Sequence, residues 1–276
     1  EFQIVSIFSK RNILVCFGVY VSLVGLAHYS GQIYIQEQNS IPGSTNRLLA
    51  RYKKIDKIFC GFPKTQDFFE EKKAIFSGNL INLNAQKVVK KKPCSGELDI
   101  KIMGGSLGAR LINKTAPKVF SQLSQDFPDF KFILSHQCGK GNLEETKSYY
   151  DSCKKNFDLK LFEFVESMES FYSNADLIIS RAGALSVSEI CETQNIAIFI
   201  PLKNSIDNHQ HENAKFLAEK NSAFICEEDL LEENLKKILF EIVKNPEILE
   251  KMKKNISRIS LTDKKNMIVK KILSNE

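Results

Sequence analysis

The stretch DIKIMGGSLGARLINKTAP, residues 99–117, contains three of the chain's 13 glycines within five positions. An apolar run at 100–103 passes directly into GGSLG at 104–108 and then into a helical pattern over 107–124. Glycine permits positive φ and lets backbone amides approach a ligand closely. A helix that starts just after the glycines directs its free N–H groups to the same place. The stretch therefore predicts a strand, an anion-binding turn and a helix, although a merely tight strand–helix turn has the same spacing.

Outward from this stretch, short apolar runs alternate with helical patterns along the whole chain. Nearly continuous apolar strands that alternate with helices are typical of parallel sheets covered on both faces. The expected fold class is therefore α/β. The predicted strands are 12–17, 32–36, 55–60, 73–77, 98–103, 130–136, 158–163, 175–180, 195–200 and 222–226. The predicted helices include 107–124, 184–193 and 209–220, and charged helices follow residue 227 with a break at Asn245-Pro246.

A segment with the composition of a linker divides the chain. KVVKKKPCSGE, residues 87–97, has four lysines, a proline and no periodicity. The chain opens at Glu1 into what reads as the end of a helix, so the first domain is expected to lack its first elements. We predict a first domain at 1–88, a linker at 89–98, a second domain at 99–260, and a C-terminal helix at 261–276 that packs back on the first domain.

The composition argues against several classes of protein. Of the 276 residues, 43% are hydrophobic and 26% are charged, as in soluble globular proteins of one or two domains. The net charge of +6 is spread over lysines along the chain and is too weak to indicate nucleic-acid binding. That charge fits an anionic membrane surface, an anionic ligand or ordinary solvated lysines. Seven scattered cysteines and four histidines without ligand spacing argue against disulfides and a metal site, and indicate a reducing cytosol.

The apolar segment ILVCFGVYVSLVGLA, residues 13–27, raises the question of a membrane span. Its 15 residues fall short of the roughly 20 that a spanning helix needs. Gly18 and Gly25 interrupt it, and no charged region or cleavage site marks a signal peptide. The segment therefore favours a buried strand that is followed by a core-facing helix over 19–29.

Two further loops follow predicted strands of the second domain. SRAGALSVSEI, residues 180–190, places Glu189 one turn into a helix, where a carboxylate either caps the helix or accepts ribose hydroxyls. PLKNSIDNHQHENA, residues 201–214, leads Gln210 into another helix. Ligands of open α/β sheets bind beyond the carboxyl ends of the strands. Three polar loops at one such edge predict one ligand site, and none of them has the pattern of a P-loop or a nicotinamide site.

Together, these loops resemble those of the MurG family of bacterial glycosyltransferases. The resemblance covers about residues 12–226, and it implies a GT-B fold of two Rossmann-like domains with parallel sheets, the first incomplete at its N-terminus. The motifs that carry it are FGVYVS (17–22), QEQNSIPGSTN (36–46), GGSLGAR (104–110), HQCGKG (136–141), SRAGALSVSE (180–189) and DNHQHENA (207–214).

The resemblance implies that the second domain holds most of a UDP-N-acetylglucosamine (UDP-GlcNAc) donor. Gly105 and Ser106 would contact the diphosphate, and the backbone of Val165 would contact the uracil. Gln210 would reach the sugar, and Asn39 would approach it from the first domain. No metal or other cofactor is implied, because helix N-termini and backbone amides would neutralise the diphosphate. The residues that would surround the diphosphate and ribose are Ala184, Leu185, Ser186, Val187, Ser188 and Glu189.

The first half departs from the family's pattern at positions that bear on catalysis and donor binding. The family's N-terminal glycine-rich loop, with the histidine usually proposed as the base, finds no counterpart, so no catalytic residue is assigned. Asn82 stands where an arginine near the diphosphate is expected, and an asparagine lacks the bidentate cation that stabilises an anion. Glu37 is a carboxylate near the expected cleft, and a hydrogen bond that fixes its loop is favoured over a role as the base.

The implied reaction is an inverting transfer of N-acetylglucosamine from UDP-GlcNAc to lipid I, the lipid-linked muramyl-pentapeptide. The product, lipid II, serves peptidoglycan synthesis and hence cell shape and cell division. The implied location is peripheral, on the cytoplasmic face of the bacterial inner membrane, without a nucleic-acid partner. Two alternatives stay open: a non-catalytic or degenerate paralogue that binds nucleotide sugars, and a related glycosyltransferase with another lipid acceptor.

Overall fold

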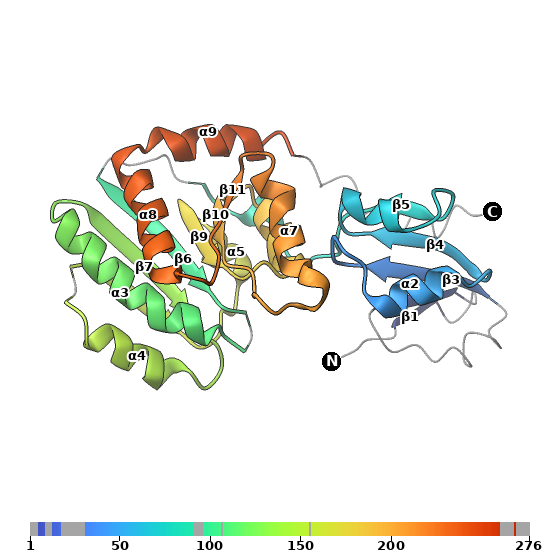
Figure 1. Ribbon diagram of the computed structural model, residues 1–276, viewed down its shortest axis with the longest axis horizontal. Coiled ribbons are helices and arrows are strands. Elements are labelled where there is room, and N and C mark those ends of the chain that lie inside the picture. The colour runs from blue at the N-terminus through green and yellow to red at the C-terminus, as the bar shows by residue number, and fades with distance from the viewer. Residues whose placement is uncertain are drawn as a thin grey trace.

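In the computed structural model the chain forms two lobes, each built on its own sheet (Figure 1). The structure describes residues 5–8, 13–17, 31–90, 96–105, 107–154, 156–259 and 268. The first sheet consists of β1 (Val5–Phe8), β2 (Ile13–Phe17), β3 (Gln32–Glu37), β4 (Ile55–Cys60) and β5 (Ala74–Phe76), in that order.

The first sheet is parallel from β2 to β5, as the sequence predicts, and β1 pairs antiparallel with β2. The expectation that the chain opens with the end of a helix is wrong for Val5–Phe8, which is a strand. Val5 and Ile7 are β-branched residues, which favour strands, and pairing with β2 satisfies the backbone of this segment.

The second sheet has six strands and all of its pairings are parallel. All six predicted strands are present, and the first begins at Glu97, inside the predicted linker. Its strands are β6 (Glu97–Met103), β7 (Lys131–Gln137), β8 (Asp158–Phe162), β9 (Leu177–Ser180), β10 (Ala197–Phe199) and β11 (Ala223–Ile225), in the order β11-β10-β9-β6-β7-β8.

The helices follow the predicted pattern, with one correction at the glycine-rich stretch. The α-helix there begins at Arg110 and not at Leu107, because Gly105 and Gly108 adopt φ angles of 84° and 76°, which an α-helix excludes. The break at Asn245-Pro246 is confirmed. The described α-helices are α2 (Ser44–Ala50), α3 (Arg110–Asp126), α4 (Leu143–Asp151), α5 (Met168–Tyr172), α6 (Ala184–Glu192), α7 (His209–Ala218), α8 (Leu231–Lys244) and α9 (Glu247–Ile256).

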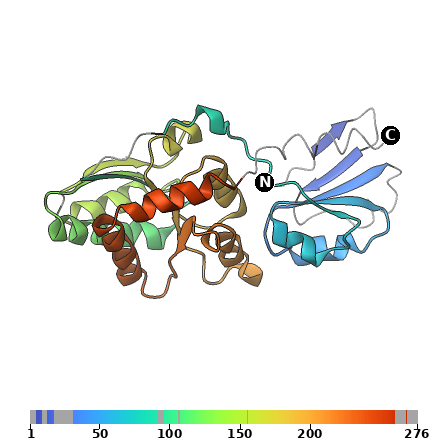
Figure 2. The same cartoon turned by 90° about the horizontal axis from the view of Figure 1, so that it is seen from above.

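The order of the second sheet reverses direction between β6 and β9. From β6 the chain adds β7 and β8 on one side, and from β9 it adds β10 and β11 on the other. Right-handed crossovers therefore place α3 and α4 on one face of the sheet and α6 and α7 on the other, and α8 packs beside α3. In the view from above, α9, in red, lies across this lobe (Figure 2). Sheets of this kind bind ligands at the point where the order reverses.

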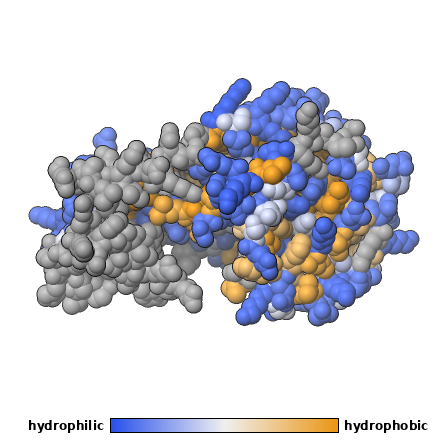
Figure 3. Space-filling view, turned by 180° about the vertical axis from the view of Figure 1, so that it is seen from behind, coloured by the Kyte–Doolittle hydropathy of each residue, from blue (hydrophilic) through white to orange (hydrophobic). Residues whose placement is uncertain are grey.

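Hydrophobic contacts extend across both lobes. One large buried cluster fills the second lobe and also includes Phe62, Ile81 and Leu83 from the first half of the chain. A smaller cluster with Ile33 and Ile58 forms the core of the first lobe. Seen from the rear, hydrophilic residues cover much of the second lobe, and hydrophobic residues show between them in separate patches (Figure 3).

Several predictions fall on positions outside the described residues. They include Ser106, the helix over 19–29 and all but one residue of the segment 261–276. The exception, Ile268, is buried in a cluster with Tyr34 and Phe59 of the first sheet. The domain boundaries and the return of the C-terminal segment remain predictions. Among the helices that the structure describes, none has both the length and the apolar character that a membrane span requires.

Candidate functional site

A cavity of about 510 Å³ lies where the order of the second sheet reverses. Its walls come from the loops that follow β6, β9 and β10, the three loops that the sequence singles out. Of the predicted site residues, Gly105, Ser186 and Gln210 line it. The other lining residues are Met103, Gly104, Leu107, Gly108, Ala109, Arg110, Ser180, Arg181, Gly183 and Leu202.

Glycine is required at two positions of the first loop, for a different structural reason at each. At Gly108 a Cβ atom would lie 2.1 Å from the carbonyl oxygen of Cys138, so this loop packs directly on the loop that follows β7. At Gly105 a Cβ atom would meet nothing within 4 Å, although the φ angle of 84° disfavours any side chain. Gly108 therefore serves close packing, and Gly105 serves the turn at the edge of the cavity.

A buried histidine supports the loop beneath Gly108. His136 lies between the Tyr150 hydroxyl, 3.0 Å from its Nδ1, and Asn113 Oδ1, 3.0 Å from its Nε2. Asn113 Nδ2 donates to the Cys138 carbonyl at 2.9 Å, which turns its oxygen toward the ring. His136 Nε2 is therefore the donor, and Nδ1 accepts from the Tyr150 hydroxyl. Burial lowers the pKa of His136 to about 3, so the ring is neutral near pH 7.

Two amide side chains hold the glycine-rich turn itself. Gln137 Nε2 donates to the carbonyl oxygens of Gly105 at 3.0 Å and Glu163 at 2.9 Å. Asn142 Nδ2 donates to the Leu107 carbonyl at 3.1 Å. These bonds use carbonyl oxygens of the loop. The N–H groups of Gly104 and Gly108 are bonded to the carbonyls of Gln137 and Gly105, whereas the Gly105 N–H has no partner among the described residues and is the group that could bind an anion.

The second loop brings a helix N-terminus and a cation to the cavity. Among the residues that the structure describes, no side chain caps the N-terminus of α6 at Gly183, which leaves its first N–H groups for a ligand. Arg181, two residues earlier, lines the cavity, pairs with Glu228 at 2.6 Å and donates to the Ile200 carbonyl at 3.1 Å. The sequence prediction assigned no role to Arg181, although the motif SRAG contains it and its place after a strand is a usable signal.

Glu189 is held by a residue that the sequence gives no reason to select. The hydroxyl of the buried Tyr172, on α5, donates to Glu189 Oε2 at 2.9 Å. Burial raises the pKa of Glu189, and the hydrogen bond from Tyr172 opposes that rise. In the part of the chain that the structure describes, Glu189 Oε1 has no hydrogen-bond partner. The carboxylate is thus oriented by one oxygen and can accept hydroxyl groups with the other.

The other predicted residues of α6 and its neighbours divide between the core and the surface. Leu185 is exposed, and Val165 is half-buried in the loop after β8, outside the walls of the cavity. Ser188 Oγ bonds to the Ala184 carbonyl at 2.9 Å. The structure thus makes Val187 and Ala184 part of the packing of α6, and both are buried.

In the first lobe, the predicted Asn39 faces the second lobe and Asn82 does not contact the cavity. Asn39 Oδ1 accepts a hydrogen bond of 3.1 Å from Asn213 Nδ2 on α7. Asn82 is exposed between the buried Ile81 and Leu83 and is not among the residues that line the cavity.

Glu37 has the loop-fixing role that the sequence favours. Its Oε1 accepts from the Asn39 N–H at 2.9 Å, and its Oε2 accepts from the Gly43 N–H at 3.2 Å and from Asn46 Nδ2 at 2.7 Å. Both oxygens therefore hold the loop 38–46 in shape. The carboxylate is buried and has both oxygens engaged in its own loop, so neither oxygen is directed at a ligand.

Helix α7 lies on the side of the second lobe that faces the first (Figure 1). Glu212 pairs with Lys64 at 2.5 Å, and the Phe216 ring meets Phe62 edge-on at 5.4 Å. At the start of the helix, Asp207 lies 3.5 Å from Arg47. Helix α6 also contacts the first lobe, where Asn79 Nδ2 donates to Ser188 Oγ at 2.9 Å.

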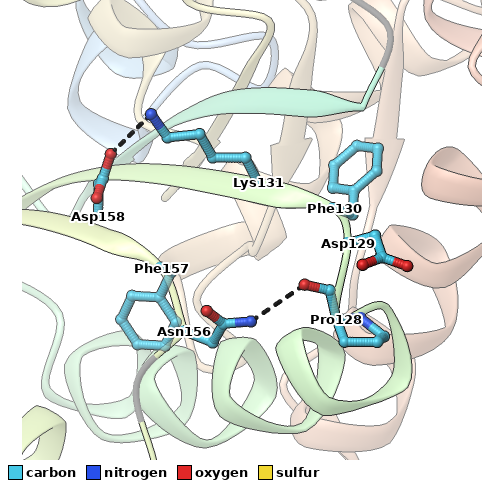
Figure 4. A pocket seen from close by; sticks show the side chains of 7 residues that line it. All are labelled: Pro128, Asp129, Phe130, Lys131, Asn156, Phe157 and Asp158. Carbon is cyan, nitrogen blue, oxygen red and sulfur yellow. Dashed lines mark hydrogen bonds and ion pairs between the residues drawn. The ribbon is translucent and has the colours of Figure 1, made fainter.

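A second cavity, of about 400 Å³, lies at the other end of the second sheet (Figure 4). It opens at the amino ends of β7 and β8, away from the three loops. Lys131 pairs with Asp158 at 3.1 Å and Asn156 donates to the Pro128 carbonyl at 3.2 Å, so these polar groups bind one another. Across the described residues no three His, Cys, Asp or Glu side chains gather as metal ligands would.

Comparisons with known proteins show which family the chain resembles. The family model of the glycosyltransferase family 28 C-terminal domain matches residues 100–271. A UDP-N-acetylglucosamine–N-acetylmuramyl-(pentapeptide) pyrophosphoryl-undecaprenol N-acetylglucosamine transferase from Acinetobacter baumannii is 35% identical in an alignment of length 254, which covers 88% of this chain and 67% of that protein. The protein of the same name from Shewanella denitrificans is 33% identical, over 86% of this chain and 64% of its own length.

Solved structures show the same relationship. The crystal structure of Acinetobacter baumannii MurG matches with a TM-score of 0.75 and 30% identity, over 93% of this chain and 73% of that one. The UDP-GlcNAc 2-epimerase of Neisseria meningitidis, in a structure with bound UDP-GlcNAc, matches with a TM-score of 0.62 at 11% identity, over 96% of this chain and 76% of that one. At that identity the likeness shows a shared fold.

Proposed function

The chain belongs to the MurG family of glycosyltransferases, and from this we propose that it transfers N-acetylglucosamine from UDP-GlcNAc to a lipid-linked muramyl-pentapeptide. The product is lipid II, a precursor of peptidoglycan. The proposed place of work is the cytoplasmic face of the inner membrane, where the protein binds peripherally and without nucleic acid.

One observation carries the proposal: three loops from separate parts of the sequence line a single cavity at the reversal point of the sheet. The turn at Gly105 and the N-terminus of α6 offer N–H groups to a diphosphate. Arg181 adds a cation. Glu189 is linked to the wall of the cavity through Tyr172, whose hydroxyl contacts both Glu189 and Met103, a residue that lines the cavity. This set of groups suits a nucleoside diphosphate that carries a neutral sugar.

The proposed chemistry is a displacement at the anomeric carbon of the donor. The 4-hydroxyl oxygen of the muramyl sugar forms a bond to that carbon as the bond to the diphosphate breaks, and UDP leaves with the electron pair. N–H groups and Arg181 stabilise the charge that develops on the leaving diphosphate. The hydroxyl proton passes to a base that lies elsewhere than Glu37, because the Glu37 carboxylate is engaged in its loop.

Calorimetric titration of UDP-GlcNAc into the chain, with UDP-glucose as control, tests donor binding, and transfer to a soluble lipid I analogue tests the reaction. Selective binding of UDP-GlcNAc together with release of UDP on addition of the acceptor is the expected result. A folded chain that binds neither nucleotide sugar contradicts the proposal. Transfer to diacylglycerol and none to the lipid I analogue assigns the chain to another lipid acceptor.

A second candidate function, binding without transfer, is favoured by Asn82. This residue stands where the family has an arginine, and it is exposed outside the cavity. If the position approaches the diphosphate when the donor binds, Asn82→Arg tightens UDP-GlcNAc by about tenfold, the effect of one charge-assisted hydrogen bond. If the wild type and Asn82→Arg both bind UDP-GlcNAc and neither transfers the sugar, the second candidate is supported.

A further inference from the structure

A fully buried asparagine of α7, Asn213, joins the two lobes at the predicted sugar site. Its Oδ1 accepts from the backbone N–H of Ser40 at 2.8 Å. Its Nδ2 donates to the Ala182 carbonyl at 3.2 Å and to Asn39 Oδ1 at 3.1 Å. One side chain therefore binds the loop after β3, the loop after β9 and the side chain of Asn39.

These partners determine the orientation of the Asn213 amide. The Ser40 N–H can only donate and the Ala182 carbonyl can only accept, so the oxygen of Asn213 must face the first and its NH2 group the second. The remaining hydrogen of that NH2 group points to Asn39 and requires an acceptor there. Asn39 therefore presents its oxygen to Asn213 and its own NH2 group elsewhere.

The backbone of Asn39 is fixed by other residues. Its N–H donates to Glu37 Oε1 at 2.9 Å, and its carbonyl accepts from Thr65 Oγ1 at 2.8 Å. Asn213 acts on Asn39 at two points: it orients the side-chain amide, and through the Ser40 N–H it holds the peptide group that follows. Within the described residues Asn39 Nδ2 has no hydrogen-bond partner, and the half-buried side chain keeps it accessible.

A second amide donor lies one helical turn away. Gln210, three residues before Asn213 on α7, lines the cavity, and its Oε1 accepts from the Leu202 N–H at 3.0 Å. Residues three apart share a helix face. Gln210 thus also has its oxygen engaged, and its NH2 group has no partner among the described residues. Gln210 lines the cavity itself, whereas Asn39 is joined to the same helix through Asn213.

We infer that Asn213 is a positioning residue, which orients the Asn39 amide so that it donates a hydrogen bond to an oxygen of the donor's sugar. The inference rests on the proposed function, because it takes the occupant of the cavity to be a nucleotide sugar. It assigns Asn39 the role of a donor, not an acceptor. The other contacts of α7, at Lys64 and Phe62, hold the lobes together without touching Asn39.

The experiment measures the dissociation constants of UDP and UDP-GlcNAc by calorimetry for the wild type, Asn39→Ala, Asn213→Ala and the double variant. The readout is the UDP constant divided by the UDP-GlcNAc constant, which isolates the contribution of the sugar. We expect each single variant to lower this ratio about fivefold to tenfold, the effect of one hydrogen bond. The double variant should lower it no further, because both changes remove the same interaction.

Lys64→Ala is the matched control, because Lys64 also bonds to α7 from the first lobe and is half exposed. It should leave the ratio unchanged. Where Asn213→Ala fails to fold, Asn213→Asp replaces it: the carboxylate keeps an acceptor for the Ser40 N–H and removes the donor to Asn39. Circular dichroism establishes that each variant is folded.

Three results overturn the inference. An unchanged ratio in the Asn213 variants, which means equal losses of UDP and UDP-GlcNAc affinity or no loss of either, assigns Asn213 a purely structural role. Losses that multiply in the double variant show that Asn39 and Asn213 act independently. A wild type that binds UDP but not UDP-GlcNAc, or binds neither, contradicts the proposed function itself and is distinct from the first two results.

Discussion

Glu189 is a carboxylate whose pKa is raised by burial and by the nearby charge of Glu169, and lowered by the hydrogen bond from Tyr172. Burial and the hydrogen bond therefore oppose each other. Only the ionised carboxylate accepts hydrogen bonds at every lone pair. The proposed contact with the ribose therefore weakens as the pH falls through the raised pKa of Glu189.

Tyr172→Phe should move this loss to higher pH, because the pKa of Glu189 rises further when the opposing hydrogen bond is removed. UDP titrations at a series of pH values from about 5 to 8 measure the shift. Glu189→Ala should weaken UDP binding by about 1–3 kcal/mol near neutral pH and abolish the dependence. An unchanged pH profile in Tyr172→Phe excludes the assigned role of the tyrosine.

His136 should couple stability to pH. Its pKa is lowered to about 3 in the folded chain, while an unfolded histidine titrates at about 6.5. Between these pH values the histidine is protonated in the unfolded chain and neutral in the folded chain. Its contribution to the free energy of unfolding is therefore fully present above about pH 6.5 and is lost as the pH drops toward 3. The loss is on the order of 5 kcal/mol over the whole interval.

His136→Gln removes the titrating group and should flatten this dependence, whatever its effect on stability at neutral pH. Urea unfolding at pH values between about 7 and 4 measures the slope for both proteins. Equal slopes would mean that other groups cause the acid sensitivity.

The strands illustrate which elements the sequence predicts well. Every strand from β2 to β11 falls where a run rich in apolar residues predicts it, because central strands of a parallel sheet are buried on both faces. The edge strand β8, DLKLF, alternates polar and apolar residues instead. The segment Val5–Phe8 was missed, since four residues are too short to show a period. The start of α3 was placed too early because Leu107 fits the helical pattern, and only the backbone angles of Gly105 and Gly108 exclude it.

The glycine-rich turn gives a prediction at this scale. Gly105→Ala should cost about 1–2 kcal/mol of stability, the strain of a side chain at positive φ. Gly108→Ala adds a collision with the Cys138 carbonyl and should cost about 3 kcal/mol or more, with loss of UDP-GlcNAc binding as the loop moves. Urea unfolding and donor titration of the two variants test the difference, and equal costs would exclude the close packing at Gly108.

At the scale of the whole molecule, the loops of the site could be predicted and their supports could not. Each loop follows a strand, so sequence order is enough to place Gly105, Ser186 and Gln210 at one edge of the sheet. Tyr172 and Asn213 act on partners far away in the sequence or in the other lobe. Contacts between residues that are distant in the sequence leave no local pattern from which they could be predicted.

Ile268 gives the prediction for the whole chain. It is buried against Tyr34 and Phe59 of the first sheet, although it follows the second domain in sequence. Ile268→Ala should lower the free energy of unfolding by about 2–4 kcal/mol, as expected for a buried aliphatic side chain. Thermal unfolding and limited proteolysis measure the effect, which should be largest in the first lobe. Leu48→Ala, at a residue of that lobe that is 54% exposed, is the control and should change little.

The bond between Ser40 and Asn213 has a consequence for how this family is studied through many sequences. Ser40 takes part through its backbone N–H, which every residue except proline possesses. Replacement of Ser40 by another small residue leaves the bond intact, so evolution has no reason to change positions 40 and 213 together. Methods that find contacts from correlated substitutions will therefore pass over this junction, whereas a proline scan of residues 38–43 should find it.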